Sequence, residues 1–170
     1  MCIRDRRGFY TRPIEVTVSS ETPDAIIRYT TDGREPTPRF GQVYTGPIPI
    51  NSTTVLRVLA SKEGMIQTNV DANSYLFSAD IIQQSDMDRS IVSSPLYSRE
   101  IRPALTRLPV VSLSFNPTDF FGGSGIHSNP SLSGTNSERA AHFEFFDPAD
   151  PEDSTHEPAG IRIHGGNARQ

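Results

Sequence analysis

Apolar and polar residues alternate in short runs through the first half of the chain. Ile14, Val16 and Val18 are separated by polar residues, which is the period-two pattern of a half-buried strand. Similar runs recur after turn-forming residues, and short strands at this spacing favour a β-sandwich. The predicted strands cover residues 14–18, 25–31, 56–60 and 70–77.

Glycine and proline mark the breaks between these strands. Asp32 and Gly33 follow the second run, and this pair favours a tight turn because glycine tolerates a positive φ. Residues 36–49 contain four prolines and two glycines. Since proline cannot donate to a sheet ladder, this stretch is predicted to be a loop or an edge strand.

The second half also contains alternating apolar and polar runs, but fewer of them. Residues 108–115 predict a strand with Val111, Leu113 and Phe115 on one face, followed by a short helical turn over 118–121. Further strands are predicted at 141–145 and 161–163. The fold class expected is mainly β: an immunoglobulin- or fibronectin-like β-sandwich, then a partial β-rich segment of a second, α+β domain.

The stretch between the halves, residues 78–106, predicts an extended linker with one short helical turn. Pro95 and Pro103 interrupt it, and it is long for a connection within a compact domain. We therefore place the domain boundary there. The alternative, that this stretch packs across the sandwich, remains open.

Composition narrows the classes of function. The chain has 170 residues, with 16 basic against 20 acidic side chains and a net charge of -4. Nucleic-acid binders normally carry a basic face, so no nucleic-acid partner is expected. No apolar run approaches the roughly 20 residues that cross a bilayer, so no membrane span is expected. The single cysteine, Cys2, excludes an internal disulfide.

Both ends of the sequence are unusual. The opening Met-Cys-Ile-Arg-Asp-Arg resembles translated adapter sequence in metagenomic gene predictions, and no secretory signal pattern follows it. We interpret residues 1–7 as a non-native or disordered leader. We also expect the chain to be an internal piece of a longer protein.

Residues 8–77 resemble a known accessory domain. Residues 8–13 read Gly-Phe-Tyr-Thr-Arg-Pro and residues 29–37 read Tyr-Thr-Thr-Asp-Gly-Arg-Glu-Pro-Thr. These motifs, in this order, are similar to the chitobiase/β-hexosaminidase C-terminal domain, a sandwich also found at the C-terminus of family 29 glycoside hydrolases. The resemblance implies an accessory module of secreted bacterial proteins, located outside the cell or at its surface.

A sugar-binding role for this module is the less favoured alternative. The chain has no tryptophan, although large amphipathic rings dominate such recognition. Its tyrosines are expected in the core or at sandwich corners. Asp32 and Glu35 could form a glycosidase pair, but a turn aspartate beside a solvent-facing glutamate is the favoured interpretation. The tyrosines expected in the core or at the corners are Tyr10, Tyr29, Tyr44 and Tyr75.

Residues 107–170 resemble the opening of the CotH kinase family. The motifs are Leu-Pro-Val-Val-Ser-Leu at 108–113, Glu-Phe-Phe-Asp-Pro at 144–148 and Ala-Gly-Ile-Arg-Ile-His-Gly-Gly at 159–166. Departures from the family pattern are His127 for an aromatic residue, Phe143 for a small one and Ala168 for serine.

The resemblance implies Mg-ATP as a cofactor of the intact parent, with Gly165, Gly166 and Arg169 near the nucleotide. Phosphoryl transfer needs a basic group on the phosphates and acids on the metal. The only lysine is Lys62, in a predicted sandwich turn. We therefore expect no catalytic residues, no cofactor and no enzymatic activity in these 170 residues.

No metal site is expected from the sequence. The four histidines are too scattered for a recognisable zinc pattern, and the acidic stretch 147–153 lacks calcium-loop spacing. The histidines are His127, His142, His156 and His164.

The leading expectation is a non-catalytic accessory or structural module joined to a truncated CotH-like domain. The rivals are a segment of an active CotH-type kinase and a carbohydrate-binding module of a glycoside hydrolase. The expected partners are neighbouring domains of the same chain, and a glycan or a cell-surface protein.

Overall fold

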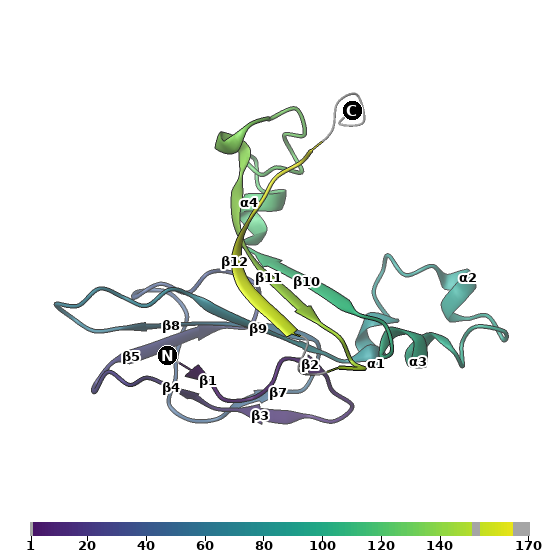
Figure 1. The fold of residues 1–170 in the computed structure, drawn as a ribbon, viewed down its shortest axis with the longest axis horizontal. Helices are drawn as coiled ribbons and strands as arrows, with labels where there is room; N and C mark the ends of the chain where they lie inside the picture. Colours follow the sequence, from purple (N-terminus) through teal and green to yellow (C-terminus); the bar gives the residue numbers. More distant parts are fainter. Residues whose placement is uncertain (1, 151–153, 165–170) are drawn as a thin grey trace.

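A computed structural model describes residues 2–150 and 154–164, and its first half folds into two facing layers of strands (Figure 1). One layer is a five-stranded sheet in the order β2-β9-β8-β5-β6, and the other contains the antiparallel pairs β1–β4 and β3–β7. The strands of the first layer are β2 (Gly8–Phe9), β5 (Ile26–Thr30), β6 (Gln42–Val43), β8 (Thr54–Ser61) and β9 (Asp71–Leu76). Those of the second are β1 (Cys2–Ile3), β3 (Ile14–Val16), β4 (Val18–Ser19) and β7 (Ile48–Ile50).

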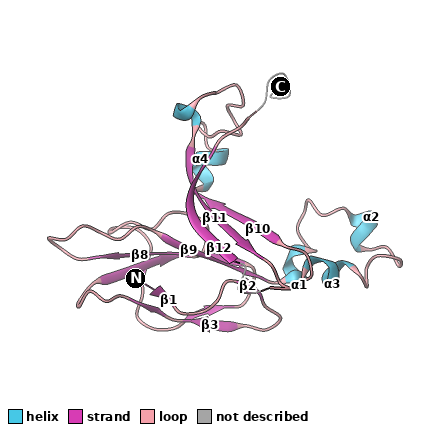
Figure 2. Ribbon diagram, in the orientation of Figure 1, coloured by secondary structure: helices cyan, strands magenta, loops and turns pink. Residues whose placement is uncertain are grey.

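The hydrophobic core lies between these two layers. Alternate residues of β3, β7 and β8 point inward, as the period-two sequence pattern predicts. Tyr75 and Leu56 are fully buried there. The buried cluster consists of Val16, Val18, Ile48, Ile50, Leu56, Val58, Tyr75 and Phe77. The predicted β-sandwich is thereby confirmed, and the described residues form a mainly β chain (Figure 2).

The proline-rich stretch behaves as predicted. β6 is the last strand in the order of the five-stranded sheet, where missing ladder donors are tolerated. Gly33 has a φ of 80° in the predicted turn, and Gly41 has a φ of 107°. Such angles favour glycine because a side chain would clash with the backbone.

Residues 2–7, predicted to be a leader, run alongside the sandwich. Ile3 pairs with Val18, and the Arg4 backbone N–H donates to the Thr17 carbonyl over 3.0 Å. The Asp5 carboxylate accepts from the Thr17 backbone N–H over 2.9 Å. That the segment is non-native stays a prediction.

The linker contains three short helices instead of the single helical turn predicted. They are α1 (Ser78–Ile81), α2 (Arg89–Val92) and α3 (Ile101–Leu105). Pro103 lies in the first turn of α3. Proline is tolerated there because backbone N–H groups in the first turn make no hydrogen bond within the helix. α1 is tied to the sandwich because Asp80 accepts from the Thr53 backbone N–H over 2.7 Å.

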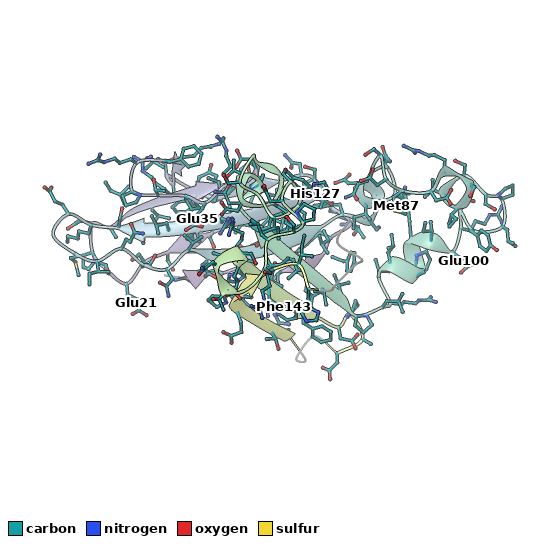
Figure 3. All side chains as sticks on the ribbon, turned by 90° about the horizontal axis from the view of Figure 1, so that it is seen from above. Glu21, Glu35, Met87, Glu100, His127 and Phe143 are labelled. Carbon is teal, nitrogen blue, oxygen red and sulfur yellow. The ribbon has the colours of Figure 1, made fainter. Side chains whose placement is uncertain are left out.

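The rest of the linker lies at one end of the molecule. Met87 and Glu100 are at this end and Glu21 is at the opposite one (Figure 3). No helix in the described part of the chain is long and apolar enough to cross a membrane.

The second half forms an antiparallel sheet in the order β10-β11-β12. Its elements are β10 (Val110–Phe115), α4 (Pro117–Phe121), the 3-10 turn η1 (Thr135–Ser137), β11 (Arg139–Phe146) and β12 (Ser154–Ile161). The predicted strands at 108–115 and 141–145 and the helical turn at 118–121 are confirmed.

The third predicted strand, 161–163, is corrected. The strand begins at Ser154 and ends at Ile161 because all eight of its residues pair with β11. The sequence of β12 does not predict a strand over this length, since polar residues and Pro158 interrupt any apolar alternation. β12 is the last strand in the sheet order, a position in which proline is tolerated.

Candidate functional site between the two sheets

The three-stranded sheet turns its polar face toward the sandwich. Val111 and Leu113 are 56% and 45% exposed, whereas Ser114 is buried. Ser112 and Ser114 pair in register with Glu144 and His142 of β11, and paired residues share a face. The predicted apolar face of β10 is therefore the outer one, and a polar layer lies between the two sheets.

Glu144 is the main link across this layer. Its side chain is fully buried. The Ser74 backbone N–H on β9 donates to Glu144 Oε1 over 3.1 Å, and the Ser74 hydroxyl donates to Oε2. The hydroxyls of Ser74 and Ser112 are 2.6 Å apart, and Arg7 Nε lies 3.9 Å from Oε1. These contacts join β9, β10 and β11.

Burial and hydrogen bonding act in opposite directions on this carboxyl. Burial raises the pKa of Glu144 because it penalises the charged form. The hydrogen bonds from Ser74 and the charge of Arg7 lower it, and burial is the largest cause.

A histidine–aspartate cluster lies beside this link. Asp71 begins β9, His142 lies on β11 and His156 on β12. The two imidazole rings have centroids 4.4 Å apart, and His156 Nε2 lies 2.9 Å from Asp71 Oδ1. One ligand atom from each side chain lies within 4.8 Å of the other two. The pairing of β11 with β12 and the stacking of both on β9 create this cluster.

The two histidines differ in environment. His142 is 6% exposed, and burial, together with the charge of His156, lowers the pKa of His142 to about 4. His142 is therefore a neutral imidazole at neutral pH. The His156 side chain is 27% exposed.

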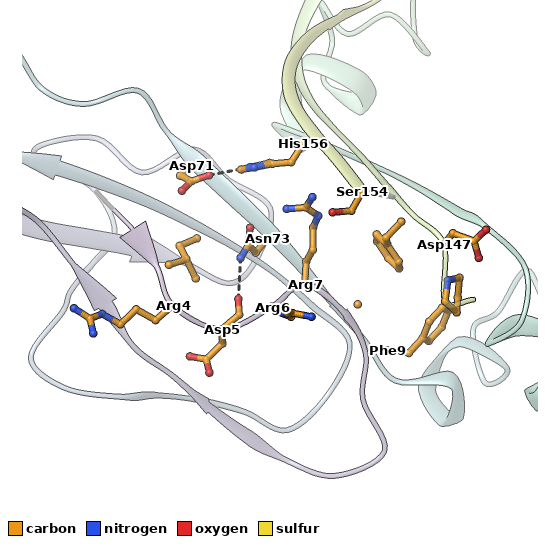
Figure 4. A pocket seen from close by; sticks show the side chains of 14 residues that line it. Arg4, Asp5, Arg6, Arg7, Phe9, Asp71, Asn73, Asp147, Ser154 and His156 are labelled. Atoms are coloured by element: carbon orange, nitrogen blue, oxygen red, sulfur yellow. Dashed lines mark hydrogen bonds and ion pairs between the residues drawn. The ribbon is translucent and has the colours of Figure 1, made fainter. Parts of the chain in front are cut away.

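A cavity of about 620 Å³ opens next to the cluster. Asp71 and His156 lie on one side, and Phe9 and Asp147 lie on the other (Figure 4). Arg4, Arg6 and Arg7 also line it. The walls thus come from the leader, the sandwich and the second sheet, so the cavity exists only where the two halves meet.

Several buried polar atoms of this region have no hydrogen-bond partner within the described residues. Buried polar groups are normally paired, so such a concentration needs an explanation. Arg57 illustrates the environment: it donates to the Gly33 carbonyl over 3.0 Å and lies 3.4 Å from Glu35, while its Nε stays unpaired. The atoms are Arg57 Nε, Ser114 Oγ and His142 Nε2, together with Arg7 Nε and His156 Nε2, whose contacts with Glu144 and Asp71 are ion pairs without hydrogen-bond geometry.

The residues singled out from the sequence lie mostly elsewhere. Asp32 is in the turn after β5 and accepts from Arg34 Nε over 2.8 Å, and Glu35 pairs with the buried Arg57. Lys62 donates to the Pro23 carbonyl at the other end of the sandwich. His127 and His164 are exposed. The proposed nucleotide neighbours, Gly165, Gly166 and Arg169, lie outside the described residues, as does part of the acidic stretch 147–153.

Short spacings between ligands along the chain do not reveal the cluster, because its three residues lie far apart in the sequence. His142 and Glu144 alternate with phenylalanines on one strand, and Ser112 and Ser114 alternate with apolar residues on its partner. Two adjacent strands with one polar face each are a signal of a polar interface. That signal was present in the sequence and could have indicated the layer.

The geometry defines a β-sandwich that carries a second sheet through a buried polar layer. Residues 6–72 match the family model of the chitobiase/beta-hexosaminidase C-terminal domain. The match spans the sandwich from before β2 to the first residues of β9, so the resemblance of the first half is confirmed. No curated protein and no solved structure matches the chain. The resemblance of residues 107–170 to the CotH kinase family stays a prediction.

Proposed function

We propose that the chain is a non-catalytic accessory module of a secreted bacterial multidomain protein, in which the sandwich carries a second sheet and holds its orientation. The observation that supports this role best is the buried bond between Ser74 and Glu144. A buried carboxylate with fixed donors tolerates little displacement, because any shift leaves polar groups unpaired. Such a contact suits a spacer that positions its neighbour.

The placement of the four tyrosines of the sandwich also supports a scaffold over a sugar-binding surface on that domain. Tyr75 is fully buried in the sandwich. Tyr10, Tyr29 and Tyr44 pack against the core cluster, and the Tyr44 hydroxyl accepts from the Val18 backbone N–H over 3.2 Å. Rings used in this way do not present a free face for stacking on a sugar.

Calorimetric unfolding of the 170-residue chain tests the scaffold role. If the sandwich and the second sheet form one unit, the chain unfolds in a single cooperative transition. Two separate transitions, with the second sheet melting independently, would contradict the proposal.

A carbohydrate-related binding module is the second candidate, and the matched family favours it because its description names chitobiase and beta-hexosaminidase. A glycan array probed with the whole chain separates the two candidates. The scaffold role predicts no saturable binding to any sugar. Saturable binding would favour the second candidate.

The CotH-like assignment of residues 107–170 completes the proposal. It is supported by the motifs at 144–148 and 159–166. We expect no phosphate transfer from Mg-ATP by the 170-residue chain, since its one lysine, Lys62, lies on the sandwich. In the parent gene, a lysine-containing strand after Arg169 followed by paired acids would favour an active kinase.

A further inference from the structure

The cluster between the sheets has the composition of a metal site. Asp71, His142 and His156 offer two imidazole nitrogens and one carboxylate oxygen, all within 4.8 Å of one another. Two histidines with one carboxylate form a common donor set for zinc in proteins. The three donors come from three different strands, so no short sequence motif contains them.

His142 provides a second, independent observation. Its side chain is buried, with 6% of its surface exposed, and its Nε2 has no hydrogen-bond partner among the described residues. An unpaired imidazole nitrogen in a buried layer costs free energy. A bound cation would satisfy this atom, because a neutral imidazole nitrogen is a metal ligand.

We propose that Asp71, His142 and His156 bind one divalent transition-metal ion, with zinc as the best match. Imidazole nitrogen suits zinc and its neighbours, whereas calcium and magnesium prefer sets made only of oxygen. The inference goes beyond the scaffold role, and zinc binding is measured without assuming that role.

The geometry needs only a small adjustment. Zinc bonds of about 2.0–2.1 Å in a tetrahedron place ligand atoms roughly 3.4 Å apart. His156 Nε2 and Asp71 Oδ1, at 2.9 Å, already lie close together. The other pairs, at 4.8 Å or less, close by rotation of side chains on fixed strands.

The surroundings supply a fourth position and a mixed electrostatic environment. Asp71 and His156 line the cavity of about 620 Å³, so water can complete the tetrahedron. The carboxylates of Asp71 and Glu144 favour a cation, whereas the charges of Arg7 and Arg57 oppose it. A bound ion would tie β9 of the sandwich to β11 and β12 of the second sheet.

Isothermal titration calorimetry with ZnCl₂ on the chelator-treated 170-residue chain tests the site. The Cys2→Ser background is used so that the lone thiol cannot contribute. We expect saturable one-to-one binding and a zinc-dependent rise in the thermal midpoint, because a ligand that binds only the folded state stabilises it. Cobalt substitution should give the visible absorption of a tetrahedral site.

Variants locate the binding atoms. His142→Gln and Asp71→Asn should each weaken zinc binding at least tenfold. His156→Gln, at a partly exposed position, is the variant that best preserves folding, and thermal midpoints in chelator check this for all three. The matched control is His127→Gln, which removes an exposed histidine outside the cluster and should leave binding unchanged.

Two results would overturn the proposal. One is the absence of saturable zinc binding by the folded chain. The other is binding that survives in the folded His156→Gln and Asp71→Asn variants, or that is lost equally in the His127→Gln control.

Discussion

The carboxylate of Glu144 on β11 accepts both the backbone N–H and the hydroxyl of Ser74 on β9. This pair joins a strand of the matched sandwich to a strand of the second sheet. Because the carboxylate is fully buried, water cannot replace either partner. The relative position of the two sheets therefore depends on a polar contact in addition to apolar packing.

Glu144→Ala should destabilise the chain. The change leaves the Ser74 backbone N–H buried without an acceptor, which costs about 1–3 kcal/mol, whereas the Ser74 hydroxyl can still donate to Ser112. Urea unfolding measures the difference. Glu157→Ala is the matched control, since Glu157 lies in the same sheet and is exposed. Equal unfolding free energies for the two variants would show that the Ser74 contact contributes nothing.

Gly41→Ala should destabilise the sandwich more than Gly46→Ala. Gly41 has a φ of 107°, and a Cβ there would lie 2.8 Å from the Tyr29 carbonyl oxygen. A left-handed conformation alone costs a residue with a side chain about 1–2 kcal/mol, and the clash adds to this. Nothing lies within 4 Å of a Cβ at Gly46. Thermal unfolding of both variants measures the two losses of stability. A larger loss for Gly46→Ala than for Gly41→Ala would refute the prediction.

Leu56→Ala should lower the free energy of unfolding much more than Leu113→Ala, although both changes truncate a leucine on a strand. Leu56 is fully buried, so its truncation should cost about 2–5 kcal/mol. Leu113 is 45% exposed on the outer face of β10, and its loss should cost about 0.5 kcal/mol. Denaturant unfolding compares them. A large cost at Leu113 would mean that the outer face is covered.

Tyr75 should make the chain sensitive to high pH. Burial raises the pKa of Tyr75 above its ordinary value of 10.0. The stability associated with the neutral phenol is full below pH 10, where both states hold the proton. As pH rises past 10 the unfolded state releases its proton first, so stability falls.

Tyr75→Phe should therefore reduce the loss of stability between pH 9 and pH 11, followed by circular dichroism in urea. Tyr97→Phe is the control because Tyr97 is 51% exposed, and it should keep the pH dependence of the unaltered chain. Identical pH profiles for the two variants would refute the role of Tyr75.

Much of the sandwich could be predicted from local pattern. Ile14, Val16 and Val18 alternate with polar residues, and a half-buried strand requires this alternation. The turn at Asp32 and Gly33 follows from the backbone freedom of glycine. β12 could not be predicted in this way, because its residues have no apolar alternation and its strand form comes from pairing with β11.

The candidate site was still less accessible to sequence reasoning. His142 and His156 do not predict a metal site from the sequence, because their spacing along the chain fits no short motif. No motif marks Asp71 as a ligand either, since it is a single acidic residue at the start of β9. Strand pairing and sheet stacking bring the three together, and both depend on contacts between distant segments.

The sequence by itself determined that this chain is mainly β, that its first half is a sandwich with a turn at Gly33, and that β10 has one apolar and one polar face. Only the tertiary structure decided that the polar face is the buried one. The physical reason is that alternation distinguishes two faces of a strand but does not say what each face meets. Here Ser74 provides the donors that make burial of Glu144 favourable, and the same stacking brings Asp71 to His142 and His156.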